Sequence, residues 1–423
     1  MSERQLSKAI AETKLPSGAW LVVGLLCLVG CLNYLDRIMI TTMREPIKAS
    51  IAMTDAQFGL LTSVFLWVYG ILSPFAGYLA DKFNRSRVII GSLFVWSLVT
   101  WLTAHVVTFE QLITTRALMG ISEACYIPAA LALILDYHRA ETQSLATGIH
   151  MAGIMVGQSL GFAGGWIAEF YDWMSAFTAF GVIGMILSLV LIVFLKDAPS
   201  RRIVSETVLK NEKMDFARGI KDLFSRRSYL LLLGFWGLFG IVGWMIMGWL
   251  PTYYGSQFNL SQGLAGLYAT GYLYPASLAG VLLGGWLADR WSKINPNARI
   301  LVPAIGLCIA APAIFIASST DTLAISILCF MIYGLTRTFS DANLMPILSR
   351  IANPTYRATG YGVLNLFSCI IGGIGLYAGG ALRDANVNLS IVFKTAALIL
   401  LCCAALLYMV RTNPRQDDAT RNY

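Results

Sequence analysis

Six charged residues lie inside long apolar stretches of this sequence, and any account of its chemistry must start from them: Asp36, Arg37, Arg116, Glu123, Arg337 and Asp341. A charge within a membrane helix is costly, so it normally faces a protein interior or an aqueous cavity and marks a pathway. Arg116 and Glu123 are seven residues apart, so on a helix both side chains point the same way, about 10 Å apart along the axis. Arg337 and Asp341 have i, i+4 spacing, which allows them to pair.

These charges permit two interpretations. In the first, they form buried ion pairs that only hold helices together. Buried pairs are weak stabilisers, because desolvation consumes most of the Coulombic gain. The second interpretation, a polar pathway for ions and a charged substrate, is therefore favoured. For Arg337 and Asp341 both interpretations stay open.

The composition is that of a membrane protein. Of 423 residues, 57% are hydrophobic and 13% are charged, whereas about a quarter are charged in soluble domains. Runs of about 20 apolar residues are long enough to cross a bilayer. They predict twelve spans, at 18–42, 57–79, 88–106, 109–136, 145–168, 174–195, 229–254, 264–287, 299–317, 322–348, 359–381 and 391–410.

The second half of the chain repeats the first. Glu123 lies in a Ser-Glu-Ala sequence five residues before Pro128, and Asp341 lies in a Ser-Asp-Ala sequence five residues before Pro346. The predicted fold class is therefore an all-α membrane protein with twelve transmembrane helices in two pseudo-symmetric six-helix bundles. The expected domains are an N-terminal bundle at 1–195, a polar linker at 196–228 and a C-terminal bundle at 229–423.

The distribution of basic residues predicts the orientation. Lysine and arginine are abundant in the linker and in the even-numbered loops, while the opposite loops hold little beyond Arg44, Lys48 and Arg383. Because cytoplasmic loops carry the excess of basic residues, both termini and the linker are expected in the cytoplasm. We expect a multi-pass protein of a cell membrane, in a bacterium the inner membrane.

Several classes of function are disfavoured. The net charge of +8 is explained by the cytoplasmic basic loops and implies no nucleic-acid partner. No Walker-type phosphate loop is present, which argues against an ATP-driven pump. The eight cysteines lie within predicted spans and show no metal-binding spacing. We expect no metal, no cofactor and no enzymatic activity, and a monomer surrounded by the lipid bilayer.

Span five carries glycines at every fourth position from Gly153 to Gly165. A stripe of this kind lets another helix backbone approach closely. The stripe can serve static packing, a face that moves against the other half, or both, since the two interpretations are compatible.

Two loops carry the same motif. The first runs from Gly77 through Leu-Ala-Asp81 to Arg85, and the second from Gly285 through Leu-Ala-Asp289 to Arg290. This pattern resembles a signature of the major facilitator superfamily. The resemblance implies a gating role for Gly77, Asp81, Arg85, Gly285, Asp289 and Arg290, in which the aspartates cap neighbouring helices and pair with basic residues to latch the cytoplasmic side. Alternatively, Asp81 and Asp289 only terminate their helices.

The N-terminal half is similar to two groups within that superfamily. The sequence from Asn33 to Arg37, with Arg116 and Glu123, resembles the anion:cation symporters, which carry sugar acids and other organic anions. The same residues, with the sequence around Gln158, resemble spinster-type transporters of lysolipids. The first resemblance implies cation coupling by Asp36 and Glu123. It also implies that Tyr34, Arg37 and Arg116 contact the anion or pair the acids.

These observations predict a secondary transporter that works by alternating access. The preferred function is symport of a small organic anion, such as a uronate, an aldonate or a sialic acid, with H⁺ or else Na⁺. Guanidinium groups bind carboxylates through two parallel hydrogen bonds, which suits such an anion. The expected substrate-binding residues are those that the resemblance implies, Tyr34, Arg37 and Arg116, together with Gln158, Arg337 and Asp341. The alternatives are a spinster-like carrier of lysolipids or other amphiphiles and a non-transporting receptor on the same fold.

Overall fold

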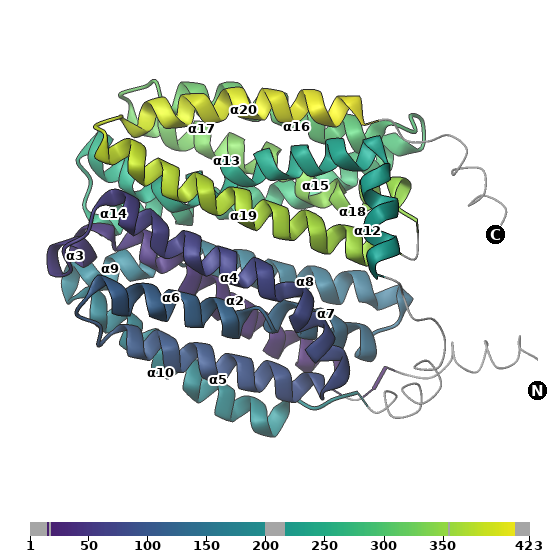
Figure 1. Ribbon diagram of the computed structural model, residues 1–423, viewed down its shortest axis with the longest axis horizontal. Coiled ribbons are helices and arrows are strands. Elements are labelled where there is room, and N and C mark those ends of the chain that lie inside the picture. The colour runs from purple at the N-terminus through teal and green to yellow at the C-terminus, as the bar shows by residue number, and fades with distance from the viewer. Residues whose placement is uncertain (1–14, 17, 199–215, 354–355, 411–423) are drawn as a thin grey trace, which may run out of the picture.

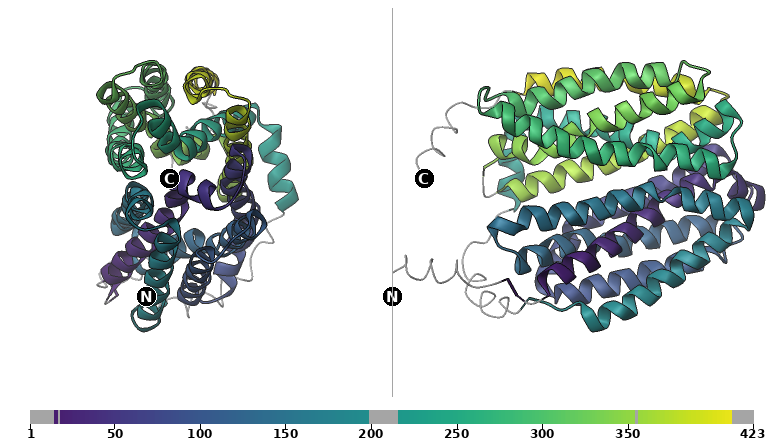
Figure 2. Two further views of the ribbon diagram at one scale, coloured as in Figure 1. Left: turned by 90° about the vertical axis from the view of Figure 1, so that its left-hand side faces the viewer. Right: turned by 180° about the vertical axis from the view of Figure 1, so that it is seen from behind.

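The computed structural model describes residues 15–16, 18–198, 216–353 and 356–410. Almost all of these residues are helical, and the long helices run roughly along one axis in two layers, one for each half of the chain (Figure 1). The views in Figure 2 show the same two layers from one end and from behind. The predicted fold class, twelve transmembrane helices in two bundles, is confirmed.

The N-terminal half consists of α2 (Ala19–Thr42), the short α3 (Arg44–Ser50), α4 (Asp55–Lys82), α5 (Arg85–Thr103), α6 (Phe109–Glu123), α7 (Tyr126–Tyr137), α8 (Ala140–Ser159), α9 (Phe162–Phe170) and α10 (Trp173–Phe194). The C-terminal half consists of α12 (Phe216–Ser225), α13 (Arg227–Phe258), α14 (Gln262–Gly266), the π-helical segment η1 (Leu267–Gly271), α15 (Leu273–Ser292), α16 (Ala298–Ala317), α17 (Leu323–Arg337), α18 (Phe339–Ile351), α19 (Arg357–Asp384) and α20 (Leu389–Met409).

We call the end of the molecule at which α12 lies the linker end, and the end at which α3 and α14 lie the distal end (Figure 1). Within the described residues, eleven helical segments are long and apolar enough to cross a membrane. The other predicted span, 264–287, falls on α14, η1 and α15, where the π-helical segment interrupts the helix. Such segments often mark functional positions.

Two spans are broken beside the charged residues. The fourth span is divided into α6 and α7 directly after Glu123, and the tenth into α17 and α18 directly after Arg337. Pro128 lies in the first turn of α7, where the amide hydrogen that proline lacks has no helical partner. In both halves the break therefore falls beside one of the charged residues within the span.

The glycine stripe of span five packs within its own half. A Cβ atom on Gly153 or Gly157 would lie within 2.6 Å of a carbonyl oxygen of α2, so the backbones of α2 and α8 are in contact. The stripe is thus mainly a static packing surface. At its distal end Gly165 also approaches the carbonyl oxygen of Gln262 in the other half.

We expect Gly157→Ala to lower the melting temperature, because the added methyl group would lie 2.0 Å from the carbonyl oxygen of Cys31. Overpacking of this kind costs roughly 1–3 kcal/mol in the free energy of unfolding. The matched control is Gly148→Ala on the same helix, since a Cβ atom there has no neighbour within 4 Å. The control should be neutral or stabilising, because alanine favours helix over glycine. Equal melting temperatures for the two variants would contradict the close packing of α2 on α8.

The last part of the predicted linker packs on the C-terminal half. Leu223 of α12 is fully buried, and Gly219 lies against the ring of Tyr356. Arg226 donates a hydrogen bond to the carbonyl oxygen of Ile351 at 3.0 Å. Helix α12 is therefore fixed to the C-terminal bundle.

Candidate functional site

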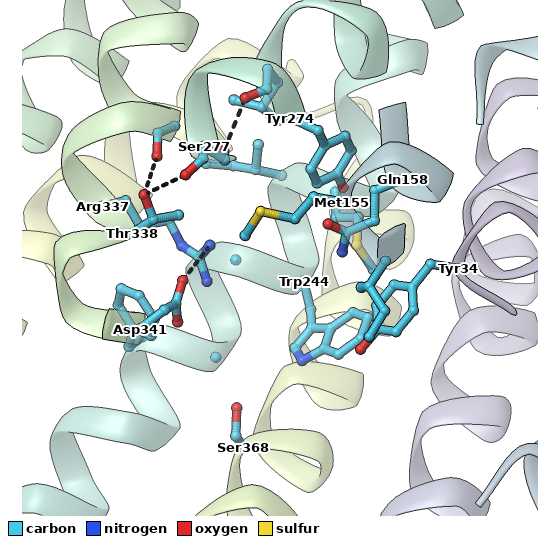
Figure 3. A pocket seen from close by; sticks show the side chains of 18 of the residues that line it. Tyr34, Met155, Gln158, Trp244, Tyr274, Ser277, Arg337, Thr338, Asp341 and Ser368 are labelled. Atoms are coloured by element: carbon cyan, nitrogen blue, oxygen red, sulfur yellow. Dashed lines mark hydrogen bonds and ion pairs between the residues drawn. The ribbon is translucent and has the colours of Figure 1, made fainter. Parts of the chain in front are cut away.

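A cavity of about 350 Å³ lies between the two halves (Figure 3). The N-terminal half contributes Tyr34 from α2, and Met155 and Gln158 with their neighbours from α8. The C-terminal half contributes most of the wall, and its aromatic members are Trp236, Phe239, Trp244, Tyr274 and Tyr333. The kinked helices and the interrupted span eight thus bring aromatic and methionine side chains around one space.

Arg337 and Asp341 supply the charges of this cavity. Arg337 Nη1 lies 3.5 Å from Asp341 Oδ2, and the two side chains are 24% and 33% exposed. The Arg337 guanidinium lies over the ring of Phe239, 4.3 Å from its centroid, and its Nε atom has no hydrogen-bond partner. In Figure 3 this pair faces Tyr34, Met155 and Gln158 across the cavity. Arg337 can therefore turn part of its guanidinium to a ligand without leaving Asp341.

Two hydroxyl groups in this wall are already engaged by the protein. Thr338 Oγ1 donates to a carbonyl oxygen, with those of Ser277, Gly334 and Leu335 each at 3.0 Å. Ser277 Oγ donates to the carbonyl oxygen of Leu273. The other polar side chains of the wall can form hydrogen bonds with a ligand: Tyr34, Gln158, Tyr274, Tyr333, Asn365 and Ser368.

The charges of the N-terminal half lie behind the cavity wall. Arg37 Nε donates to Glu123 Oε2 at 2.5 Å, and the two side chains are 2% and 0% exposed. Neither residue lines the cavity. Glu123 Oε1 has no hydrogen-bond partner, so this acid keeps one oxygen available for a proton.

Three aromatic rings surround the Arg37 guanidinium. Its carbon lies 4.6 Å from the ring centroid of Tyr34, 5.0 Å from that of Phe65 and 4.4 Å from that of Tyr69. Cation–π contacts of this kind stabilise a buried cation by about 0.5–2 kcal/mol each. Tyr34 also lines the cavity, so its side chain connects the cavity to the Arg37–Glu123 pair.

Asp36 and Arg116 are buried in the same half but do not form an ion pair with each other. Asp36 is fully buried and accepts a hydrogen bond of 3.4 Å from Thr100. Arg116 is 2% exposed, lies 5.4 Å from the ring centroid of Phe177, and its Nε and Nη2 atoms have no hydrogen-bond partner. Neither Arg37 nor Arg116 is among the residues that line the cavity, and their contact with a substrate stays a prediction.

Some residues of this region carried no signal in the sequence. Trp96 and Ser97 are buried, and Trp96 Nε1 and Ser97 Oγ have no hydrogen-bond partner. A single polar or aromatic residue in an apolar helix is common, so only the fold shows that these polar atoms are buried. Among the described residues, no group of three or more His, Cys, Asp or Glu is placed to hold a metal ion.

The two loop motifs are arranged as follows. Arg85 pairs with Asp136 at 2.5 Å and donates to the carbonyl oxygen of Ala132. Asp289 is 68% exposed and pairs with Arg299 of its own half at 2.7 Å. Arg290 lies over the ring of Trp286.

The other predicted gating residues are Gly77, Asp81 and Gly285. Gly285 packs loosely, since a Cβ atom there would have only Ala342 nearby, at 4.0 Å. The side chains at positions 77–81, and with them the predicted gating contacts of Gly77 and Asp81, lie outside the described part of the structure. The capping role of the motif aspartates therefore stays a prediction.

Comparison with known proteins identifies the family. The family model described as Major Facilitator Superfamily matches residues 26–376. The chain is 27% identical over 404 residues to an MFS-type efflux pump of Mycolicibacterium smegmatis, covering 92% of this chain and 90% of that protein. It is 30% identical over 402 residues to protein spinster homolog 1 of Bos taurus, and the match covers 88% of this chain and 74% of that protein.

A solved structure has the same fold. It is the crystal structure of a bacterial homolog to the human lysosomal transporter Spinster, in an inward-facing and occupied conformation. The TM-score is 0.79 at 22% sequence identity, and the match covers 95% of this chain and 99% of that one. With the family match over most of its length, this chain belongs to the major facilitator superfamily of membrane transporters.

Proposed function

We propose that this transporter moves an amphiphilic organic anion through the cavity by alternating access, coupled to the uptake of a proton. The observation that carries the proposal is the cavity itself, in which one charged pair, Arg337 and Asp341, faces walls of aromatic and methionine side chains. Ligand sites of this composition bury an apolar body and fix its orientation through a few polar groups.

The composition of the wall favours an amphiphile over a sugar acid. A sugar acid needs hydrogen-bond partners for most of its hydroxyl groups, because unpaired polar groups are costly to bury. Here Ser277 and Thr338 already donate to backbone carbonyls, and the only arginine among the residues that line the cavity is Arg337. The resemblance to spinster proteins supports the same choice. Sugar acids remain the second candidate, since aromatic rings also stack on sugars and the side chains of Gln158, Asn365 and Ser368 offer further polar groups in the wall.

Coupling is assigned to Glu123 and Asp36. Glu123 is fully buried beside Arg37, and both acids keep one carboxylate oxygen without a hydrogen-bond partner. When Glu123 takes up a proton, Arg37 loses its ion pair but remains among three aromatic rings. The arrangement therefore supports a reversible change of charge at Glu123 that Tyr34 can transmit to the cavity.

The orientation follows from the sequence. Because basic residues are concentrated in the linker and in the loops on its side, we place the linker end and both termini in the cytoplasm and the distal end outside. The protein acts as a monomer in a cell membrane, which is the inner membrane in a bacterium.

Ligand-induced thermal stabilisation tests the substrate class. The purified protein is screened against lysophospholipids with anionic and zwitterionic headgroups, fatty acids, uronates, aldonates, sialic acid and neutral sugars. We expect the anionic amphiphiles to raise the melting temperature and the neutral sugars to have no effect. A ligand at 100 times its dissociation constant stabilises the folded state by about 2.7 kcal/mol, which is readily measured.

Two further steps complete this test. Uptake of the stabilising compound into proteoliposomes, with and without an inward proton gradient, separates a transporter from a receptor on the same fold. Stabilisation by sugar acids alone would replace the amphiphile with the second candidate. Binding without uptake under any gradient would contradict the transport proposal.

A further inference from the structure

The three basic residues of the distal loops meet at one carboxylate. Asp55, which is 6% exposed at the start of α4, pairs with Arg44 and Lys48 of its own half. It also accepts a hydrogen bond from Arg383 Nε of α19, in the other half, at 2.6 Å. Asp55 is thus a charged centre shared by both halves at the distal end.

The residue after Arg383 completes this contact. Asp384, the last residue of α19, accepts hydrogen bonds from the backbone N–H groups of Asp55 and Ala56, each at 2.8 Å. The first N–H groups of a helix have no partner within it, and a carboxylate there is favoured by the helix dipole. Asp384 therefore caps a helix of the opposite half.

The reverse contact exists on the other side of the molecule. Glu169, near the end of α9 in the N-terminal half, accepts a hydrogen bond of 2.8 Å from the N–H of Gly263 at the start of α14. Spans two and eight occupy equivalent positions in the repeat, as do spans five and eleven. In each case an acid at the distal end of span five or eleven caps span eight or two of the other half.

We propose that Asp384 and Glu169 are paired gate residues which hold the distal end closed by capping a helix of the opposite half. The proposal rests on alternating access as the proposed mode of transport. When the halves separate at this end, both caps must break together, because each joins one half to the other. The two acids and the three amide groups that they cap then form hydrogen bonds with water instead.

The contacts suit a gate that must open. Asp384 and Glu169 are both exposed, so water can replace their capping contacts at modest cost. The Asp55–Arg383 pair also joins the two halves, and when it breaks Asp55 keeps Arg44 and Lys48 of its own half as partners. Further hydrogen bonds between the halves lie about two to three turns from these caps along the same spans, from Ser63 to the carbonyl oxygen of Gly373 and from Thr270 to that of Ser159. They strengthen the closed state without adding net charge.

Amide hydrogen exchange, read by mass spectrometry on the reconstituted full chain, tests this coupling. Asp384→Asn should raise exchange at Asp55 and Ala56 by roughly tenfold, because a charge-assisted hydrogen bond is lost. If the two caps form one gate, exchange at Gly263 should also rise, by roughly three- to tenfold, since the closed population falls. Glu169→Gln should produce the reciprocal change at Asp55 and Ala56.

The matched control is Asp172→Asn. Asp172 caps α10 within its own half, through a hydrogen bond of 2.6 Å from Ser175 N–H. Its variant should alter exchange at Ser175 and at neither gate cap. If each gate variant changes exchange only at the amides that it caps, the caps are local and the proposal is overturned. The measurement uses no substrate, so its outcome is independent of whether the proposed cargo is correct.

Discussion

Replacing Glu123 with glutamine should abolish accumulation of substrate against its gradient, while exchange of substrate across the membrane continues. Glutamine has the shape of the protonated acid and can still accept a hydrogen bond from Arg37, which now lies 2.5 Å from Glu123 Oε2. It cannot gain or lose a proton, so a proton gradient no longer drives the transport cycle. We expect the variant to show no accumulation of substrate above the equilibrium level.

The variant should remain folded. Removing one partner of a fully buried pair usually costs roughly 3–5 kcal/mol, but the aromatic rings of Tyr34, Phe65 and Tyr69 retain the Arg37 cation. The measurement compares gradient-driven uptake with counterflow in proteoliposomes, using the compound that stabilises the protein in the screen. Glu110→Gln, an exposed acid on the same helix α6, is the control. Undiminished gradient-driven accumulation by Glu123→Gln would remove Glu123 as the coupling acid.

The double variant Arg337→Met/Asp341→Leu should be folded and should lose substrate binding. The pair is part-exposed in the cavity, so replacing both partners by apolar groups of similar size leaves no unpaired charge and costs little stability. Arg337 alone changed to methionine would leave Asp341 without its cation, which lowers stability by less than the roughly 3–5 kcal/mol of a fully buried pair. Loss of affinity in a stable protein would therefore report ligand recognition rather than misfolding.

A second arginine–aspartate pair provides a matched control. Arg226 and Asp222 are also four residues apart, lie 3.1 Å from each other and are 28% and 32% exposed, but they lie at α12, away from the cavity. Arg226→Met/Asp222→Leu should keep wild-type binding. The readouts are the melting temperature and the ligand-induced shift in it. If the Arg337/Asp341 double variant binds and transports normally, the pair is structural and recognition belongs to other residues.

The sequence by itself determined the class of the molecule. The apolar runs are long enough to cross a bilayer, and charges within them are costly, so their positions were informative without any structure. The repeat that relates Glu123 to Asp341 predicted two equivalent halves, and the family match over residues 26–376 agrees with that prediction. These inferences depend only on spacing along one helix at a time.

Only the tertiary structure decided which charges meet. Arg37 pairs with Glu123, Arg116 lies over the ring of Phe177, and Arg337 is the arginine among the residues that line the cavity. Arg44 and Lys48 converge on Asp55 with Arg383, which lies more than 300 residues further along the sequence. Helical periodicity fixes which residues share a face, but the rotation of each helix, its breaks and its depth beside its neighbours arise from packing between helices. Those quantities set the distance between two side chains on different helices, and no local pattern encodes them.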